Sequence, residues 1–473
     1  MLRSFIGTRS FYKRVLSLML PIMVQNGITN LVNMLDNVMV GQVGTVEMTG
    51  VAVANQLIFV FNLCVFGAVS GAGIFGAQFF GSGDHRGLRD TFRFKLVFCT
   101  GLTVCGVALL VLCGEPLVQM YLRGDGEVTD AAASLRYALD YLWIILIGLL
   151  PAALVQCYAS TLRETGQTLV PMYAGLAAVL VNLGLNYVLI FGRFGAPVLG
   201  VQGAAIATVI SRFVELAVVV LWTHRHTEKN PFIVGALRSL HVPGALIRQI
   251  VLKGLPLMLN ETLWALGIAL ANQRYSLRGL DVVAANNISQ TFFNVFSVAF
   301  MAVGAAIGII LGQMLGAGET DGARDAARKL IAFSVFTGAV VGAVYFICAQ
   351  WIPDIYNTTE EVRLLATRLM QITALLMPVD AFAHASYFTL RSGGKIWITI
   401  LFDSCFVWAV TVTSSTLLTQ YTALPILPLY AICQGLNIIK CVLGYIFVRK
   451  GSWAHKIVSA EPEEDAAAVS GEN

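Results

Sequence analysis

Twelve long apolar stretches run through this chain of 473 residues and restrict its fold more than any other feature. A helix needs about 20 apolar residues to cross the hydrocarbon core of a membrane, and the stretches are too continuous for the short alternating strands of a membrane β-barrel. We therefore predict an all-α integral membrane protein with twelve transmembrane helices. The predicted spans are residues 15–38, 51–78, 94–113, 138–161, 169–191, 201–222, 250–272, 283–313, 329–350, 364–388, 396–418 and 425–448.

The charged residues support this count. Only 12% of the residues are charged, about half the share in an ordinary soluble domain. With the N-terminus placed in the cytoplasm, the cytoplasmic segments hold 22 of the 31 Lys and Arg, the outer loops hold seven, and Arg212 and Lys440 lie within spans. This bias follows the positive-inside rule. It predicts a multi-pass protein of the inner (cytoplasmic) membrane with both termini in the cytoplasm.

An internal repeat divides the chain into two halves. The heptapeptide "TLRETGQ" at 161–167 returns as "TLRSGGK" at 389–395, 228 positions later. "GSGDHRGLRD" at 81–90 matches "GAGETDGARD" at 316–325, and Pro21 matches Pro256, both at an offset of 235. Because six spans separate each pair, the halves share one orientation in the membrane.

This arrangement predicts two six-helix lobes related by a pseudo-twofold axis along the membrane normal, around a central cavity near the midplane. We expect an N-lobe at 1–222, a cytoplasmic linker at 223–249, a C-lobe at 250–458 and a disordered cytoplasmic tail at 459–473. Arg163 and Arg391 lie in the repeated turns, and we expect them to hold these turns in the cytoplasmic interface.

Polar residues inside the spans are the candidate site residues. A charge at the centre of a spanning helix costs about 2.5–3.5 kcal/mol on insertion scales and is usually functional. Asp36, Glu261 and Asp380 each lie in an apolar run without a basic partner at helical spacing. Other candidates share a helical face with one another or with these acids. In the first span the stripe is Asn26, Thr29, Asn30, Asn33, Asp36 and Asn37, with Asn33 as a further candidate. Later spans contribute Asn182 and Asn186 in the fifth, Thr208 in the sixth, Asn287, Gln290, Asn294 and Ser297 in the eighth, and His384, one turn after Asp380, in the tenth.

Several of these residues also have a purely structural interpretation. The stripe that contains Asn287 can hold helices together through hydrogen bonds. His384 can be a packing residue, and Arg212 and Glu215 can pair at i,i+3 spacing. Asp403 and Lys440 can lie close enough to an interface to stay hydrated.

The three acids indicate a type of chemistry. A carboxylate in an apolar cavity can hold a proton near neutral pH, coordinate Na⁺ together with amide and hydroxyl oxygens, or pair with a cationic substrate. If ion and substrate compete for one carboxylate, binding of either releases the other, which is the minimal chemistry of an antiporter. Since the sequence contains no nucleotide-binding domain, we expect an ion gradient to supply the energy.

The motifs resemble those of the multidrug and toxic compound extrusion (MATE) family over nearly the whole chain. The resemblance is carried by "MLDNVMVGQVG" (34–44), "TLRETGQTLVPM" (161–172), "VNLGLNYVLIFG" (181–192), "GVQGAAIAT" (200–208), "PLMLNETLW" (256–264) and "MPVDAFAHASYFTLRSGGK" (377–395). It implies two six-helix lobes, a V-shaped cavity, and export of mostly cationic apolar compounds driven by inward H⁺ or Na⁺.

The resemblance also implies roles for residues. Asp36 matches the first-span carboxylate of the family's N-lobe cation site, with Asn182, Asn186 and Thr208 as its partners and Tyr141 as a fourth-span aromatic. Asp380 and Glu261 match C-lobe carboxylates. Where many members have Asp, this chain has Asn186, so the N-lobe site holds one carboxylate. Na⁺ could bind at Asp36, Asn182, Asn186 and Thr208 or at Glu261 and Asp380, and H⁺ is the alternative coupling ion at both sites.

The expected partners are cationic small molecules and the lipid bilayer, with neither nucleic acid nor ATP, no cofactor beyond the coupling ion, and a monomeric state. A lipid-linked oligosaccharide flippase of the same superfamily is the alternative, but its phosphates would need a basic cavity. An intramembrane protease is the alternative among enzymes, since "GSGD" (81–84) resembles part of a protease motif. Its Asp84 lies in a basic turn and lacks a second acid at a shared site, so we expect no enzyme.

Overall fold

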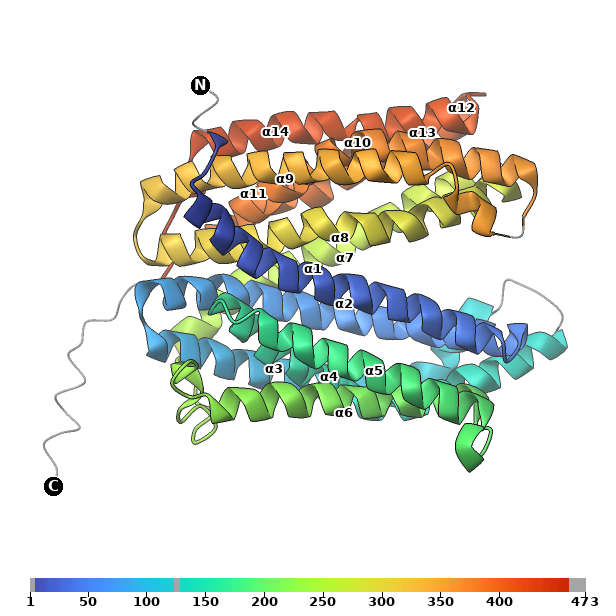
Figure 1. Cartoon of the computed structure of the whole chain (residues 1–473), viewed down its shortest axis with the longest axis horizontal. Coiled ribbons are helices and arrows are strands. Elements are labelled where there is room, and N and C mark those ends of the chain that lie inside the picture. Colours follow the sequence, from blue (N-terminus) through green and yellow to red (C-terminus); the bar gives the residue numbers. More distant parts are fainter. Residues whose placement is uncertain (1–4, 123–127, 357, 459–473) are drawn as a thin grey trace, which may run out of the picture.

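The computed structural model describes residues 5–122, 128–356 and 358–458, so the predicted tail lies outside the described residues. All regular structure in the described part is helical (Figure 1). The α-helices are α1 (Arg9–Gly41), α2 (Thr45–Ser82), α3 (His85–Leu122), α4 (Val128–Glu164), α5 (Leu169–Phe191), α6 (Gly200–Arg225), α7 (Gly244–Ser276), α8 (Leu280–Gly316), α9 (Thr320–Cys348), α10 (Glu360–Ser392), α11 (Ile396–Ile400), α12 (Thr413–Tyr421), α13 (Ile426–Gly435) and α14 (Asn437–Lys450). Short 3₁₀ segments are η2 (Arg193–Gly195), η3 (Pro231–Ile233) and η4 (Ile352–Ile355), and π-helical turns are η5 (Leu401–Cys405) and η6 (Val407–Val412).

Twelve helical stretches of the described chain are long and apolar enough to cross a membrane, which confirms the predicted fold class. The eleventh runs from α11 through η5 and η6 to α12, and the twelfth joins α13 to α14. Several predicted spans were shorter than the helices that contain them. Residues 94–113 were predicted for the third span, whereas α3 contains 38 residues, because apolar content marks only the hydrocarbon-facing part of a helix that continues beyond it.

The helices form two layers in Figure 1, with α2 to α6 in one layer and α8 to α14 in the other. Two helices bridge the layers. α1 packs against α5 on one side and α8 on the other, and α7 packs against α2. Since α1 and α7 are the first helices of the two sequence halves, each half sends its first helix against the second helix of the other half.

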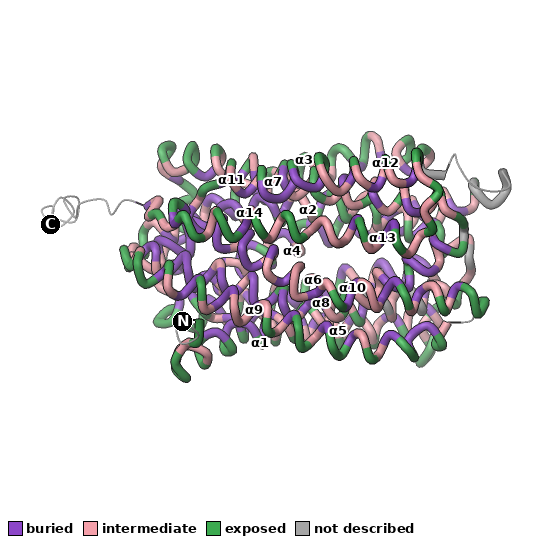
Figure 2. The backbone as a smooth tube through the Cα atoms, turned by 90° about the horizontal axis from the view of Figure 1, so that it is seen from above, coloured by how far each residue is buried: buried purple, intermediate pink, exposed green. Residues whose placement is uncertain are grey.

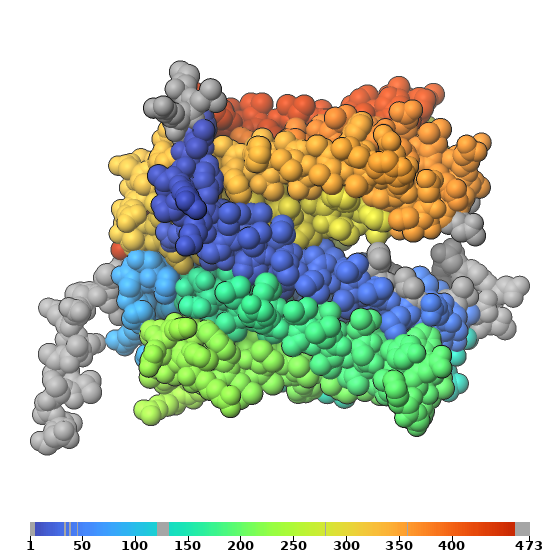
Figure 3. Space-filling view, viewed as in Figure 1, coloured from blue at the N-terminus to red at the C-terminus, as the bar shows by residue number. Residues whose placement is uncertain are grey.

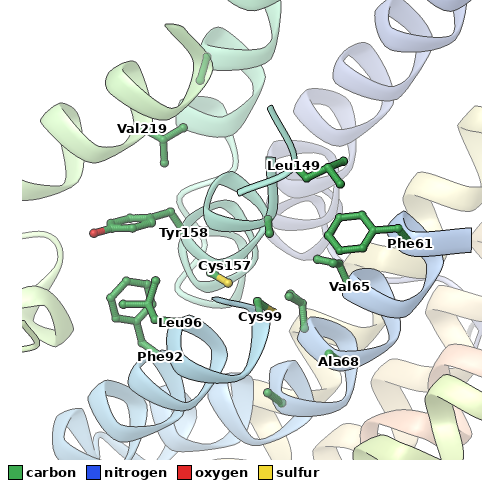
Figure 4. Packing of buried hydrophobic residues seen from close by; sticks show 14 of the residues in the cluster. Phe61, Val65, Ala68, Phe92, Leu96, Cys99, Leu149, Cys157, Tyr158 and Val219 are labelled. Carbon is green, nitrogen blue, oxygen red and sulfur yellow. The ribbon is translucent and has the colours of Figure 1, made fainter. Parts of the chain in front are cut away.

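The outer surface has the character expected for contact with lipid. Exposed and half-buried residues alternate with buried ones along the outer helices (Figure 2), and the exposed side chains include large apolar ones such as Leu112, Leu252 and Leu375. Inside the N-lobe, apolar side chains from α2, α3 and α4 interlock, with Phe61, Phe92 and Leu149 among them (Figure 4). The same α3–α4 contact also buries the ion pair Lys95–Glu164, with Lys95 Nζ 2.6 Å from Glu164 Oε1.

The repeated sequence turns are also repeated in backbone conformation. Gly83 and Gly318, at the ends of α2 and α8, have φ angles of 78° and 83°. Gly166 and Gly394, after α4 and α10, have φ angles of 86° and 69°. A left-handed backbone of this kind strongly favours glycine, which explains why glycine recurs at these matched positions.

The lobes are closed at one end and separated at the other. Near the predicted cytoplasmic end, Gly81 of α2 lies directly against the backbone of Gln313 of α8, and Gly316 lies directly against the backbone of Gln78, without space for a Cβ at either glycine. At the opposite end, the molecule is hollowed between the two layers (Figure 3). The structure is therefore open toward the predicted outer face.

The expected position of one basic residue is wrong. Arg391 is buried, with 5% of its surface exposed, and so does not anchor its turn at an interface as expected. It lies within the helical part of the repeat motif, one turn before the glycine, where the surrounding helices cover it. Within the predicted linker, α6 continues to Arg225 and α7 begins at Gly244, and the buried Phe232 of η3 packs edge-on against Phe92 of α3, with ring centres 5.2 Å apart.

Candidate functional site

A cavity of about 660 Å³ lies within the N-lobe. Its walls come from α1, α2, α4, α5 and α6, and they are apolar except for a band of amides, hydroxyls and three charged side chains. Its principal polar residues are Asp36, Asn55, Asn62, Tyr141, Gln156, Asn182, Asn186, Thr208, Arg212 and Glu215. The five N-lobe residues that the sequence singled out as Asp36 and its partners are therefore brought to one cavity.

The close approach of α5 and α6 places the amides opposite the hydroxyl. The turn between the helices begins at Gly192, with a φ angle of 64°, and Leu199 N donates to Leu189 O at 2.9 Å. A Cβ on Gly203 would lie 2.7 Å from the carbonyl of Leu189, so only glycine allows this packing. Because α5 and α6 are this close, the Asn182 amide reaches Thr208 Oγ1 at 3.3 Å.

Asp36 is surrounded by neutral amides. Asn186 Nδ2 donates to Asp36 Oδ1 at 2.6 Å, and among the described residues no Lys or Arg forms an ion pair with Asp36. The amide oxygen of Asn186 is buried and has no partner. Tyr141 is 7% exposed and lines the same cavity. Asp36 is thus a carboxylate without a counter-charge in contact with it, beside an unused amide oxygen.

The Asn182 amide has two possible orientations against Asp36. With its nitrogen toward Asp36, that nitrogen lies 3.0 and 3.2 Å from the two carboxylate oxygens, and the amide oxygen accepts from Thr208 Oγ1. With its oxygen in that position, it accepts from Asn186 Nδ2 at 3.2 Å but also faces the carboxylate. The second orientation brings acceptors together, so it needs a proton or a cation between them.

Arg212 and Glu215 lie in the same cavity and form an ion pair at 2.9 Å within α6. This i,i+3 pairing is the structural interpretation that the sequence allowed. The Glu215 side chain is 8% exposed, whereas that of Arg212 is 43% exposed.

The buried charges of the C-lobe are organised differently. Lys440 Nζ donates to Asp403 Oδ1 at 2.6 Å, and Asn260 Nδ2 donates to Asp403 Oδ2 at 3.1 Å. Glu261 accepts from Tyr387 OH at 2.6 Å and lies 3.7 Å from Arg391 Nη1. Asp403 and Lys440 are thus paired in the interior, with side chains 10% and 13% exposed, and are not hydrated at an interface as the sequence allowed.

The other C-lobe candidates are not joined to this network by any hydrogen bond or ion pair of the described chain. Asp380 Oδ1 accepts from Asn437 Nδ2 at 3.4 Å, and no such contact links it to Glu261. The His384 ring packs against Phe388, with centres 5.0 Å apart, and toward Phe300. Asn287 is exposed and does not line the N-lobe cavity. Asn33 belongs to α1, but its side chain lies outside the described residues.

Sequence reasoning missed Tyr387 and Arg391 as parts of the C-lobe network. Asp380, His384, Tyr387 and Arg391 follow one another at steps of four, three and four residues. This spacing places them on one helical face, which was the available signal. Asn260 was missed because it directly precedes the more conspicuous Glu261.

Comparison with known proteins agrees with this architecture. The family model MatE matches residues 21–188 and again residues 256–410, which reproduces the internal repeat. The chain is 23% identical to the probable multidrug resistance protein NorM of Thermotoga maritima over 454 residues, which cover 94% of each chain. It is 25% identical to the multidrug resistance protein MdtK of Edwardsiella ictaluri over 372 residues, 78% of this chain and 79% of that one.

Solved structures show the same fold. A structure described as the outward-facing conformation of a multidrug resistance MATE family transporter superposes with a TM-score of 0.85 at 17% identity, covering 96% of this chain and 98% of the other. Both halves match the family model, the relatives match over most of their length, and twelve spans are present. The chain therefore belongs to the MatE family of multi-pass membrane proteins, the multidrug efflux transporters known as MATE.

Proposed function

We propose that this protein is a secondary active antiporter that exports cationic amphipathic small molecules in exchange for H⁺ or Na⁺. The observation that carries the proposal is Asp36, an acid in the wall of a 660 Å³ cavity with amide neighbours and no ion-pair partner in the described chain. Such a carboxylate has two ways to be neutralised: by the coupling ion or by the charge of a substrate.

The geometry around Asp36 supports exchange between these two states. When Asp36 is protonated, its hydroxyl can donate a hydrogen bond to the Asn182 oxygen, since the two oxygens lie 3.0 Å apart. When a cationic substrate replaces the proton, the Asn182 amide can turn its nitrogen toward the carboxylate and its oxygen toward Thr208. One amide rotation therefore accompanies the exchange of charge.

Both candidate coupling ions have groups here that could bind them. A proton needs only the carboxylate. Na⁺ would be held by oxygens of Asp36, Asn182 and Asn186, and the unpartnered Asn186 oxygen favours such a ligand. In the C-lobe, Glu261 lies 3.7 Å from Arg391 and is less available for exchange. Asp380 accepts from Asn437 and has no ion-pair partner in the described chain, so Glu261 with Asp380 stays the second candidate ion site.

The direction of transport is supported by charge and shape. The excess of Lys and Arg on alternate loops favours cytoplasmic termini, and the hollow between the lobes then opens to the outside. In this state a coupling ion can enter from the outer face while the substrate leaves.

The test uses purified protein in liposomes with a fluorescent amphipathic cation as substrate. An imposed pH or Na⁺ gradient should drive transport in the wild-type protein, and the ion whose gradient drives it is the coupling ion. Asp36→Asn should lower gradient-driven transport at least about tenfold. Asp281→Asn, at an exposed acid in the first turn of α8, is the matched control and should behave as wild type.

Two results would contradict the proposal. Wild-type transport that persists with both gradients collapsed would exclude secondary active transport. Wild-type activity in Asp36→Asn, at equal reconstitution, would show that Asp36 is not the coupling residue.

A further inference from the structure

Arg212 is a basic residue in a cavity that we expect to bind cations, and its position calls for an explanation. The charged residues that line the cavity are Asp36, Arg212 and Glu215. Glu215 is almost buried, whereas 43% of the Arg212 side chain is exposed. Since a charged side chain inside a membrane protein faces a cavity or a partner, this exposed part of Arg212 is available to a ligand.

The pairing of Arg212 uses only part of its guanidinium. The structure records one bond, from Nη1 to Glu215 Oε2 at 2.9 Å. A guanidinium carries five donors in a rigid fork that suits a carboxylate. Unused donors of Arg212 therefore remain on a side chain that lines the cavity.

Glu215 does not depend on Arg212 alone for neutralisation. Arg163, at the end of α4, also interacts electrostatically with Glu215. Arg163 interacts in the same way with Glu164, whose carboxylate is bonded to Lys95 Nζ at 2.6 Å. Glu215 therefore keeps a second basic neighbour when Arg212 turns its free donors toward a ligand.

The repeat provides an internal comparison for Arg212. Its equivalent at an offset of 228 is Lys440, and these are the two basic residues that the sequence places within spans. Lys440 is 13% exposed, bonds Asp403 and lies over the rings of Phe402 and Phe406. The C-lobe therefore encloses its basic residue, whereas the N-lobe leaves its own open to a cavity.

Two of the three charged residues of the cavity, Asp36 and Arg212, lie at different depths. Thr208, which contacts the amides around Asp36, is four residues before Arg212 in α6. One helical turn spans about 5.4 Å. Asp36 lies toward the predicted outer end, and Arg212 lies about one turn deeper toward the predicted cytoplasmic end, with apolar walls including Ile58, Phe66 and Leu149 around them.

We propose that Arg212 is a specificity-determining residue that binds the carboxylate of zwitterionic substrates, whose ammonium or iminium group lies toward Asp36. This inference rests on the proposed function and adds to it the residue that selects for molecules with a positive and a negative group about one helical turn apart. Arg212 binds the negative group through the donors that Glu215 leaves free.

The experiment compares two dyes that differ by one charge. A rhodamine with a free carboxylate is a zwitterion, and its methyl ester is a cation of nearly the same shape. Transport of each dye into liposomes is measured with wild-type protein, Arg212→Gln, Arg212→Lys and Glu215→Gln, and the quantity compared is the ratio of zwitterion to ester transport. Binding of both dyes to detergent-solubilised protein gives the same ratio for a variant that binds but does not transport.

Arg212→Gln should lower the ratio about tenfold, as expected for loss of a charge-assisted hydrogen bond. Arg212→Lys keeps the charge but loses the fork and should give an intermediate ratio. Glu215→Gln should leave the ratio at or above the wild-type value, because it releases further donors of Arg212. A role of Arg212 in stability alone would lower transport of both dyes together.

An unchanged ratio in Arg212→Gln would overturn the inference. Wild-type transport of the ester without the zwitterion would also overturn it while leaving the proposed function intact. Wild-type transport of neither dye would contradict the proposed function, and the inference would fall with it.

Discussion

In the N-lobe, Asp36 stands among neutral amides in the wall of a cavity, whereas in the C-lobe Asp403 is bonded to Lys440 at 2.6 Å and Glu261 lies 3.7 Å from Arg391. The two halves share their turns, and Arg212 in one matches Lys440 in the other. The difference between the lobes therefore lies in the contacts of the buried side chains and not in the arrangement of the backbone.

The contrast concerns these three acids: in the proposed function Asp36 exchanges ions, whereas Asp403 and Glu261 are held by basic residues. It does not extend to every buried charge, because the N-lobe also holds the ion pair Lys95–Glu164 at 2.6 Å and the C-lobe holds Asp380, which accepts from Asn437.

The largest expected effect on stability comes from Asp403→Asn in the C-lobe. The same change of Asp to Asn at Asp36 in the N-lobe is the comparison. Asp403→Asn leaves Lys440 as a buried charge without a counter-ion, and we expect it to lower the free energy of unfolding by about 3–5 kcal/mol. Asp36→Asn removes a carboxylate that has no basic partner in contact, so we expect a change within about 1 kcal/mol. Unfolding in mixed detergent micelles measures both.

A double variant checks the cause of the Asp403 effect. Asp403→Leu combined with Lys440→Met removes both charges and should recover most of the lost stability. Equal effects of Asp36→Asn and Asp403→Asn would remove the proposed difference between the lobes.

A smaller effect is expected at Tyr387, whose hydroxyl donates to Glu261 at 2.6 Å. Tyr387→Phe removes a hydrogen bond to a charged acceptor and should lower the free energy of unfolding by about 1.5–3 kcal/mol. The matched control is Tyr430→Phe, which removes a bond to the neutral hydroxyl of Thr373 at 3.0 Å and should cost about 0.5–1.5 kcal/mol. If both variants lose the same free energy, Glu261 is not charged in this state.

These contrasts also mark what the sequence could and could not predict. The spans followed from apolar length, and the grouping of Asp36 with Asn182, Asn186 and Thr208 followed from helical spacing together with the family resemblance. The pairs Asp403–Lys440 and Glu261–Arg391 could not be predicted, because each joins different helices. Their contact depends on how those helices are rotated and packed, which the period of a single helix does not specify.

Helix ends were predicted poorly for a related reason. Apolar length reports where a helix meets hydrocarbon, whereas α3 and α4 continue well beyond it in regions whose polar residues are equally compatible with a loop. The burial of Arg391 was missed in the same way, because a basic residue near a turn was assumed to face water.

The smallest expected effect concerns the closed end, where the two lobes are symmetric rather than different. Gln78 Nε2 donates across the boundary to Ser392 O at 3.1 Å, and Gln313 Nε2 donates in the other direction to Glu164 O at 2.7 Å. The donors are 235 residues apart and the acceptors 228, the two offsets of the repeat. Each glutamine oxygen also accepts a bond, from Ile457 N for Gln78 and from Arg14 Nη2 for Gln313.

Opening toward the predicted cytoplasmic face must break both glutamine contacts. Gln78→Ala and Gln313→Ala should therefore each shift the equilibrium toward the inward-open state by about 1 kcal/mol, roughly fivefold in population. Spin labels at His85 and Asp321, in the first turns of α3 and α9, measure that population as a change in distance. Gln119→Ala, which removes a bond to Glu115 within α3, is the control. Because the contacts are related by the repeat, the two variants should have similar effects, and a shift in only one of them would show that the lobes are held together asymmetrically.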